Sequence, residues 1–331
     1  IDAARRKGER FEGEAYSYSR AFTYVPSSDD RSWALAERGR LGLREVAVLD
    51  PTAGGGAVPL EATRLDLTTF GNDLNPVAGI VERATIEFPW AYGSAVKREF
   101  DRLAAAFVVR REERLLPFFP PEPDEDAIPT NFIWGRTIRC AHCEGLVPLS
   151  PNWRLAPDGT GICLLPQQGT GPGDRSRSVR IEIVSKAKDQ SGGTVSGGDA
   201  TCPFHDCGRL ISGDHIKAEA QAGRMAEQLC AVVFKRRVET KTKSGKRGKD
   251  KWIRGYRAPR PEDEVSERIA AVLAEKLPEW ESLDIVPTES VPRGHKTEEP
   301  IRYGMANWRD MFSPRQLLGH GTAVEMIRQL M

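Results

Sequence analysis

The sequence predicts a mixed α/β fold, in which an open, doubly wound parallel sheet carries an inserted β domain. Two observations predict it. A strand–turn–helix–strand pattern with three consecutive glycines occupies residues 46–73, and two close pairs of cysteines follow between residues 140 and 207. The doubly wound sheet follows from the first pattern and the insertion from the second. With 331 residues, the chain has room for two or three domains that each bury a core.

Composition narrows the class of protein before any motif is considered. Hydrophobic residues are 39% and charged residues 29% of the chain, which is typical of a globular protein. The formal net charge is +1, so any surface that attracts nucleic acid must be local. The longest purely apolar run, residues 103–109, is too short to cross a bilayer, and no charged-then-apolar leader opens the chain. We therefore predict a cytoplasmic protein with no membrane partner.

The first elements are predicted within VAVLDPTAGGGAVPLEATRLDLTTFGNDLNP, residues 46–76. Apolar residues precede a turn made of little but backbone, and a helical pattern follows with Pro59 in its first turn. A second apolar run then ends at Gly-Asn-Asp. The predicted elements are a buried parallel strand at Val46–Leu49, a helix beginning at residue 57, and a strand at Thr68–Phe70.

The ends of these two strands are the predicted ligand site, because doubly wound sheets bind ligands beyond the carboxyl ends of their strands. Glycines there let a ligand approach the main chain, and Asp73 can accept bonds from ribose hydroxyls, which favours an adenosine-containing cofactor. For NAD, the third glycine of G-x-G-x-x-G is missing, and Asp50 would repel a pyrophosphate. S-adenosylmethionine suits Asp50 because its ammonium and sulfonium groups are cationic. The remaining alternative is a glycine-rich turn that binds nothing.

The cysteine pairs have the spacing of a structural zinc site. One pair is C-x2-C and the other is C-x4-C, and short strand-like segments precede both, as in a zinc ribbon. The alternatives are two reactive dithiols or a lost site. Cys163 and Cys230 have no near cysteine partner and are predicted to be ordinary apolar positions. The predicted ligands are Cys140, Cys143, Cys202 and Cys207.

A basic segment follows the cysteine pairs. Lys235–Arg260 is strongly basic, with Trp252 and Tyr256 among the charges, and flanking strand-like runs predict a hairpin with a basic tip. Such a hairpin could bind along the phosphates of a nucleic acid, with an aromatic ring available for stacking, or it could be a solvated charged surface.

Ser313-Pro314 predicts the start of a helix, which two glycines at 319 and 321 interrupt.

Three sequence blocks together resemble one family. They are DPTAGGGAVPLEATRLDLTTFGNDLNPVA, then FIWGRTIRCAHCEGLVPLSPNWRL with its partner CPFHDCG, and then YGMANWRDMFSPRQLL. They look like the adenine-specific DNA methylase family with an inserted zinc ribbon, found in bacteria and archaea, including restriction-like and phage-defence systems of the DISARM type. The resemblance runs from about Arg44 onward. The first and third blocks carry its specificity, because cysteine knuckles occur in many proteins.

The resemblance implies a Rossmann-like S-adenosylmethionine-dependent methyltransferase core with an inserted zinc ribbon, acting on N6 of adenine in double-stranded DNA. Other defence-system subunits are implied as further partners. The same match implies that the four cysteines hold zinc, that Asp73 holds the ribose hydroxyls, and that Leu74 and Asn75 lie beside the adenine. The implied cofactor loop is Asp50, Pro51, Thr52, Ala53, Gly54 and Gly56.

Catalytic residues are not assigned, because the family's [DNS]-P-P-[YFW] tetrapeptide is missing from the sequence. Asn75-Pro76-Val77-Ala78 lacks the second proline and the aromatic residue. The family places the tetrapeptide beyond the RQLL helix, and the chain begins at Ile1 and ends in a helical pattern, so we expect a fragment of a longer polypeptide. A split enzyme or an inactive member is the alternative. Other functions left open are a non-catalytic zinc-ribbon DNA-binding module and an RNA base methyltransferase.

The resulting domain prediction follows the chain in order. It comprises an N-terminal segment at 1–43, the first part of the methyltransferase core at 44–92, a helix and proline-rich connector at 93–136, a zinc-ribbon insertion at 137–212, a basic α/β extension at 213–300, and a helix returning to the core at 301–331.

Overall fold

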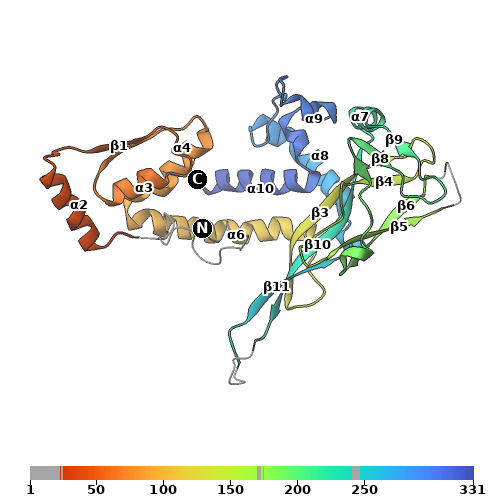
Figure 1. Cartoon of the computed structure of the whole chain (residues 1–331), viewed down its shortest axis with the longest axis horizontal. Coiled ribbons are helices and arrows are strands. Elements are labelled where there is room, and N and C mark those ends of the chain that lie inside the picture. The colour runs from red at the N-terminus through yellow and green to blue at the C-terminus, as the bar shows by residue number, and fades with distance from the viewer. Residues whose placement is uncertain (1–22, 24, 170–172, 174, 241–246) are drawn as a thin grey trace, which may run out of the picture. The chain divides into compact units, whose positions relative to one another are not determined.

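The computed structural model describes residues 23, 25–169, 173, 175–240 and 247–331. This part of the chain is mixed α/β, which confirms the coarse fold class (Figure 1). It divides into two compact units, residues 1–106 and 107–331. None of the described helices combines the length and the apolar character that a membrane span requires. Most of the predicted N-terminal segment, residues 1–22 and 24, lies outside the described residues.

The first unit is built on a β–α–β motif, as the glycine-rich segment predicts. Its two strands are parallel, and the first residue of one strand lies opposite the first residue of the other. Asn75 caps the next helix by accepting a hydrogen bond from the Val77 N–H group, and Pro76 occupies its first position. The elements are α2 (Ser28–Arg40), β1 (Ala47–Asp50), α3 (Ala57–Arg64), β2 (Thr68–Gly71), α4 (Pro76–Glu82), the π-helical η1 (Arg83–Glu87) and α5 (Phe88–Tyr92).

One expectation for this motif is wrong. The strand predicted to be buried is only partly covered, because the described sheet of this unit contains just two strands. Leu49 and Phe70 lie opposite each other in the register and are 66% and 58% exposed. The apolar run therefore correctly predicts a strand but not its burial, which depends on neighbours that this pair of strands does not have.

The second unit contains an antiparallel sheet with strand order β11-β10-β3-β4. Two small sheets accompany it, one formed by β5 and β6 and the other by β7, β8 and β9. The strands are β3 (Ala127–Arg139), β4 (Leu146–Leu149), β5 (Gly161–Gln167), β6 (Ser178–Val184), β7 (Val195–Ser196), β8 (Asp199–Thr201), β9 (Leu210–Ile211), β10 (Ala226–Val238) and β11 (Lys251–Arg257).

The second unit also contains helices, of which the sequence predicted the one that begins at Pro314. The long helix α6 (Ser94–Leu115) contains the boundary between the units. The others are α7 (Gly213–Gln221), α8 (Ser266–Ser282), α9 (Glu298–Arg302) and α10 (Pro314–Leu330), with 3-10 turns η2 (Leu116–Phe118), η3 (Ala187–Asp189), η4 (Pro261–Asp263) and η5 (Trp308–Met311).

The strand β3 crosses a predicted boundary. It begins at Ala127, inside the segment predicted to be a connector, and it pairs along most of its length with β10. The predicted zinc-ribbon and basic segments therefore share one sheet. Pro129, which suggested a connector, lies opposite Phe234 next to a register shift, a position where a strand tolerates proline.

Helix α10 is continuous, although its two glycines predicted an interruption. Ser313 caps it with a capping box and Pro314 opens it, both as predicted. Gly321 is buried against the Trp280 ring of α8, and a Cβ atom at this position would collide with that ring. The glycine therefore permits close helix packing. α10 packs against α8, and its Glu325 also pairs with Arg114 of α6 at 3.1 Å. The return of α10 to a methyltransferase core stays a prediction.

Candidate metal centre and cofactor loop

Two hairpin tips bring the four predicted cysteines together. One cysteine pair lies between β3 and β4, and the other lies between β8 and β9. In the first turn the Cys140 N–H group donates to the Gly145 carbonyl at 2.9 Å, and in the second the Cys202 N–H group donates to the Arg209 carbonyl at 3.0 Å. Both pairs therefore lie on turns of the same kind, at the end of a two-stranded ladder.

The sulfur positions fit a tetrahedral metal ion. The Sγ atoms of Cys140 and Cys207 are 3.8 Å apart, those of Cys143 and Cys202 are 3.7 Å apart, and all four lie within 4.8 Å of one another. A tetrahedron with Zn–S bonds of about 2.3 Å has edges of about 3.8 Å, whereas a disulfide needs about 2.05 Å. The arrangement is compatible with Zn²⁺ and has no open position.

Backbone amides complete the sulfur environment. Each cysteine receives a hydrogen bond from the N–H group two residues further along the chain, starting with His142 N to Cys140 Sγ at 3.5 Å. The same relation holds for Gly145 with Cys143, Phe204 with Cys202 and Arg209 with Cys207. These donors stabilise negative sulfur, so the turns are prepared for thiolates.

Burial opposes that charge when no cation is present. It raises the pKa of the Cys143 and Cys202 thiols above the ordinary value. At Cys207 burial also acts to raise the pKa, but the Arg209 amide and the neighbouring thiols outweigh it and the pKa is lowered. A divalent cation would reverse the balance by binding the deprotonated forms. Cys163 and Cys230 lie outside the cluster, as predicted.

A buried arginine lies beside the cluster, and the sequence did not reveal it. Arg177 is 0% exposed and its guanidinium carbon lies 4.5 Å from the centre of the Phe204 ring. Two of its nitrogens donate to the Asp206 carboxylate at 2.8 and 2.5 Å. Four thiolates around one Zn²⁺ carry excess negative charge, which this guanidinium would partly offset.

The predicted cofactor loop joins the carboxyl ends of β1 and β2. The Asn72 N–H group donates to the Asp50 carbonyl at 2.9 Å, and the Ala53 N–H group donates to the Asn72 carbonyl at 3.0 Å. Gly54 N donates to Oδ2 of Asp73 at 2.9 Å. The structure thus brings the loop residues 50–56 and Asp73 to the same end of the motif.

Asp73 is an ionised acceptor at this end. Hydrogen bonds from the backbone N–H groups of Asn75 and Gly54 hold the pKa of its carboxyl below the ordinary value. A carboxylate has about four lone-pair positions, so these two bonds leave capacity for ribose hydroxyls. The next residue, Leu74, is fully exposed, and Asn75 is committed to capping α4.

Two loop glycines are required by the local backbone. Gly54 has φ of +55° and Gly56 has φ of +76°, a region that other residues rarely adopt. A Cβ atom on Gly56 would lie 2.9 Å from the Ile86 side chain and 3.2 Å from that of Glu82. The tight turn therefore requires glycine at both positions, in agreement with the sequence pattern.

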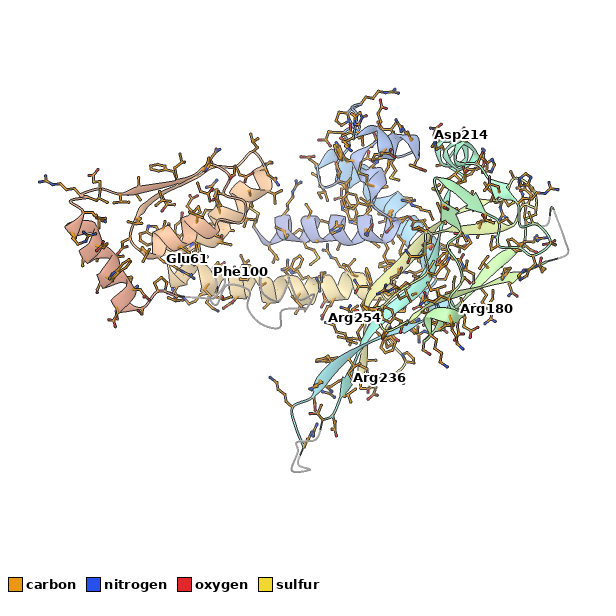
Figure 2. All side chains as sticks on the ribbon, in the orientation of Figure 1. Glu61, Phe100, Arg180, Asp214, Arg236 and Arg254 are labelled. Carbon is orange, nitrogen blue, oxygen red and sulfur yellow. The ribbon has the colours of Figure 1, made fainter. Side chains whose placement is uncertain are left out.

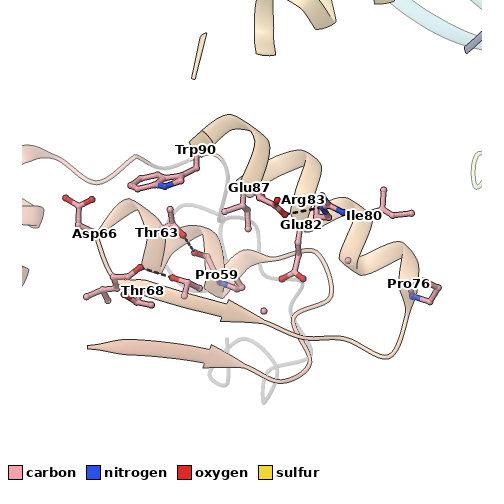
Figure 3. A pocket seen from close by; sticks show the side chains of 15 residues that line it. Pro59, Thr63, Asp66, Thr68, Pro76, Ile80, Glu82, Arg83, Glu87 and Trp90 are labelled. Carbon is pink, nitrogen blue, oxygen red and sulfur yellow. Dashed lines mark hydrogen bonds and ion pairs between the residues drawn. The ribbon is translucent and has the colours of Figure 1, made fainter. Parts of the chain in front are cut away.

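A cavity of about 770 Å³ lies beside this motif, and the sequence did not predict it. Figure 3 shows Pro59 and Thr63 of α3 on one side and Ile80, Glu82 and Trp90 on the other. Oε1 of Glu82 is buried there without a hydrogen-bond partner in the described part of the chain. None of the predicted cofactor-loop residues lines this cavity.

The basic hairpin predicted at residues 235–260 is formed by β10 and β11, and its two faces differ in charge. On one face Lys235 lies opposite Arg254 and Arg237 lies opposite Trp252. Lys235 and Arg254 are exposed and make no ion pair among the described residues, and Trp252 is 52% exposed.

On the opposite face Arg236 pairs with Asp124 and Asp126, so its charge is compensated. Figure 2 labels Arg236 and Arg254 on the two strands of the hairpin. At the tip, Arg247 pairs with Glu239 and Asp250. Lys246 of the predicted basic tip lies outside the described residues. The uncompensated charge is therefore on the strands rather than on the described part of the tip.

No family model matches the sequence, and no curated protein or solved structure matches it. The geometry alone defines the class of protein. It is a mixed α/β protein with a β–α–β motif and a cluster of four cysteines that could hold a metal ion.

Proposed function

We propose that this chain is the cofactor-binding and zinc-ribbon part of an S-adenosylmethionine-dependent N6-adenine DNA methyltransferase of the restriction or phage-defence kind. The observation that carries the proposal is the bond between the Gly54 amide and the Asp73 carboxylate at 2.9 Å. It joins a glycine turn and an ionised acceptor at the carboxyl ends of two parallel strands, where such sheets bind adenosine. Asp50 beside them favours a cationic cofactor over a pyrophosphate.

In this proposal the residues of this chain bind and position the cofactor. The four cysteines hold a structural zinc ion that stabilises the zinc ribbon. Asp73 orients the ribose, and the glycine turn accepts the rest of the cofactor. The target adenine must leave the duplex stack, which costs a few kcal/mol. When bound, S-adenosylmethionine would supply the methyl group for the amino nitrogen, leaving as S-adenosylhomocysteine while the nitrogen loses a proton. The role of this chain would be to hold the cofactor in position.

Calorimetric titration with S-adenosylmethionine, with NAD as the control ligand, tests the cofactor. We expect saturable binding of the first and none of the second. Asp73→Ala is expected to weaken binding by about tenfold or more, because it removes a charged acceptor. Asp101→Ala removes an exposed carboxylate of α6 and is the matched control. Equal affinity of wild type and Asp73→Ala would remove the ribose assignment.

A second candidate function is a nucleic-acid-binding module without chemistry, and the uncompensated face of the β10–β11 hairpin favours it. Two like charges directly opposite each other destabilise a strand pair unless something neutralises them. Phosphates would do so at Lys235 and Arg254, and Trp252 on the same face could stack on a base. This module and the methyltransferase are compatible, since an enzyme also needs to hold its DNA.

The salt dependence of DNA binding tests this face. Each lost phosphate contact reduces the slope of log K against log salt by about 0.9 for duplex DNA. Lys235→Gln combined with Arg254→Gln is therefore expected to reduce the slope by roughly 2. Arg236→Gln, on the paired face, is the control and should leave it nearly unchanged. Stronger binding of structured RNA than of duplex DNA would instead favour an RNA base methyltransferase.

A further inference from the structure

Arg315, in the first turn of α10, is a buried cation with few polar partners. It is 6% exposed. Its Nη2 donates to the Asp263 carbonyl at 2.9 Å, while Nε and Nη1 have no hydrogen-bond partner in the described part of the chain. Burial lowers the pKa of its guanidinium. Charged groups this deeply buried normally have their hydrogen-bonding capacity satisfied.

Aromatic rings surround the guanidinium. Its central carbon lies 4.3 Å from the centre of the Phe132 ring, 5.4 Å from Trp134 and 5.6 Å from Phe119. Such contacts are stronger when they are desolvated, and they offset part of the cost of burying the charge. They supply no negative charge, so the cation remains under-compensated.

Asp263 and Glu264 act on Arg315 through their negative charge without forming an ion pair with it. Asp263 and a third carboxylate, Glu227, are committed to other partners. Glu227 pairs with Arg136 at 3.1 Å. The Asp263 side chain is bound by Arg257 at 2.5 Å. No carboxylate within the described ranges forms an ion pair with Arg315.

Two adjoining cavities lie at this point. Their volumes are about 430 and 350 Å³, and Arg315 lines both. Asn131 and Gln316 line the first cavity. Oε1 of Gln316 accepts from the Ser313 N–H group at 2.9 Å, so the amide of the exposed Asn131 is the one available to a base beside the aromatic rings. The start of α10 also lines both, and a 17-residue helix presents the positive end of its dipole there. The shared lining is Trp134, Arg136, Glu227, Ser313 and Arg315.

We propose that these cavities bind a nucleotide, with its phosphate at Arg315 and the start of α10 and its base among the aromatic side chains and the Asn131 amide. A phosphate supplies the negative charge that Arg315 lacks, and helix N-termini favour such anions. Aromatic rings accept any base by stacking. The ligand is either a free nucleotide or one nucleotide of a nucleic-acid strand. The site belongs wholly to the second unit and does not depend on the cofactor proposal.

Titration of the whole chain with dTMP tests the site. A thymine nucleotide is used because it carries no adenosine for the cofactor loop. We expect saturable binding, much weaker binding of thymidine and of inorganic phosphate, and no change in the Asp73→Ala variant. Binding of an oligothymidylate but not of dTMP would identify a strand as the source of the nucleotide. It would support the site if Asn131→Trp weakens that binding and overturn it if Asn131→Trp leaves it unchanged, because the β10–β11 hairpin could also bind a strand. Failure of both to bind would overturn the proposal.

Two variants connect binding to this place. Asn131→Trp fills the first cavity from an exposed position on β3 and is expected to weaken binding by about tenfold or more. Arg315→Gln should have the same effect, and Asn131→Trp keeps the test decisive if Arg315→Gln does not fold. Arg254→Gln, outside the cavities, is the control for dTMP. Unchanged dTMP binding in folded Asn131→Trp, or phosphate binding as strong as dTMP, would refute the nucleotide site.

Discussion

Replacing Cys202 with serine is expected to abolish metal binding by the four cysteines and to unfold the part of the second unit that contains them. Structural zinc contributes apparent free energies of about 10–16 kcal/mol in small zinc-binding peptides at neutral pH. A whole domain is stable by only about 5–15 kcal/mol. Cys202 is 3% exposed in a core cluster that contains three of the four cysteines. Loss of the ion therefore leaves buried thiols and unsupported turns.

Metal analysis and thermal unfolding together measure this effect. We expect one zinc ion per chain in the purified protein, and a large fall of Tm on adding a chelator. The Cys202→Ser protein should lack zinc, and its Tm should already be low and should not fall further on adding the chelator. Cys163→Ser makes the same chemical change outside the cluster, and it should keep the zinc ion and the chelator-sensitive Tm of the wild type. A folded, zinc-free wild-type protein with an unchanged Tm would contradict the metal assignment.

The parts that the sequence predicts well are those whose geometry is local. Residues 50–56 form a tight turn because two glycines there take a backbone conformation with positive φ. The cysteine spacings predict the knuckles for the same reason, since each turn positions its own two sulfurs. The two knuckles lie far apart in the sequence. Their proximity in the fold is nevertheless predictable, because each supplies two of the four thiolates that a structural zinc site requires.

The parts that the sequence misses depend on distant partners. β3 is a long strand because β10 pairs with it, about a hundred residues later in the chain. In the sequence Gly321 interrupts a helical pattern, whereas in the structure it lies within α10 and the Trp280 ring packs against it. A charged residue in the first turn of a helix normally points to solvent, so nothing in the sequence predicts that Arg315 is buried among three rings. These features arise from packing and not from periodicity.

Arg315 is also adjacent to the most buried ion pairs described in the second unit, which stabilise the connection between β11 and α8. Asp263 is 0% exposed and binds two nitrogens of Arg257 at 2.5 and 2.9 Å. The backbone N–H group of Arg260 donates to the same carboxylate at 2.8 Å. On its other side, Arg257 binds Glu122 at 2.8 Å. One carboxylate thus orders the chain at η4.

Asp263→Ala is expected to destabilise the second unit by about 3–5 kcal/mol, because it leaves a partly buried arginine without one of its two carboxylates. Asp263→Asn keeps the size and one acceptor and should cost less. Glu262→Ala, at the exposed neighbouring residue, is the control and should stay within about 0.5 kcal/mol of wild type. Chemical unfolding monitored by tryptophan fluorescence gives the three values. Equal stability of Asp263→Ala and Glu262→Ala would show that the network contributes nothing.

The same carboxylate makes stability depend on pH, and the sign follows from its pKa. Burial acts to raise the pKa of Asp263, but hydrogen bonds and charge from Arg257, with help from Arg260, outweigh it and the pKa is lowered in the folded protein. Below its unfolded value of about 3.9, the unfolded chain binds the proton first. The stabilisation is therefore complete above that pH and is lost as the pH falls through the folded value. Wild type should lose stability in that acidic range more steeply than Asp263→Ala, whereas parallel curves would assign the acid sensitivity to other groups.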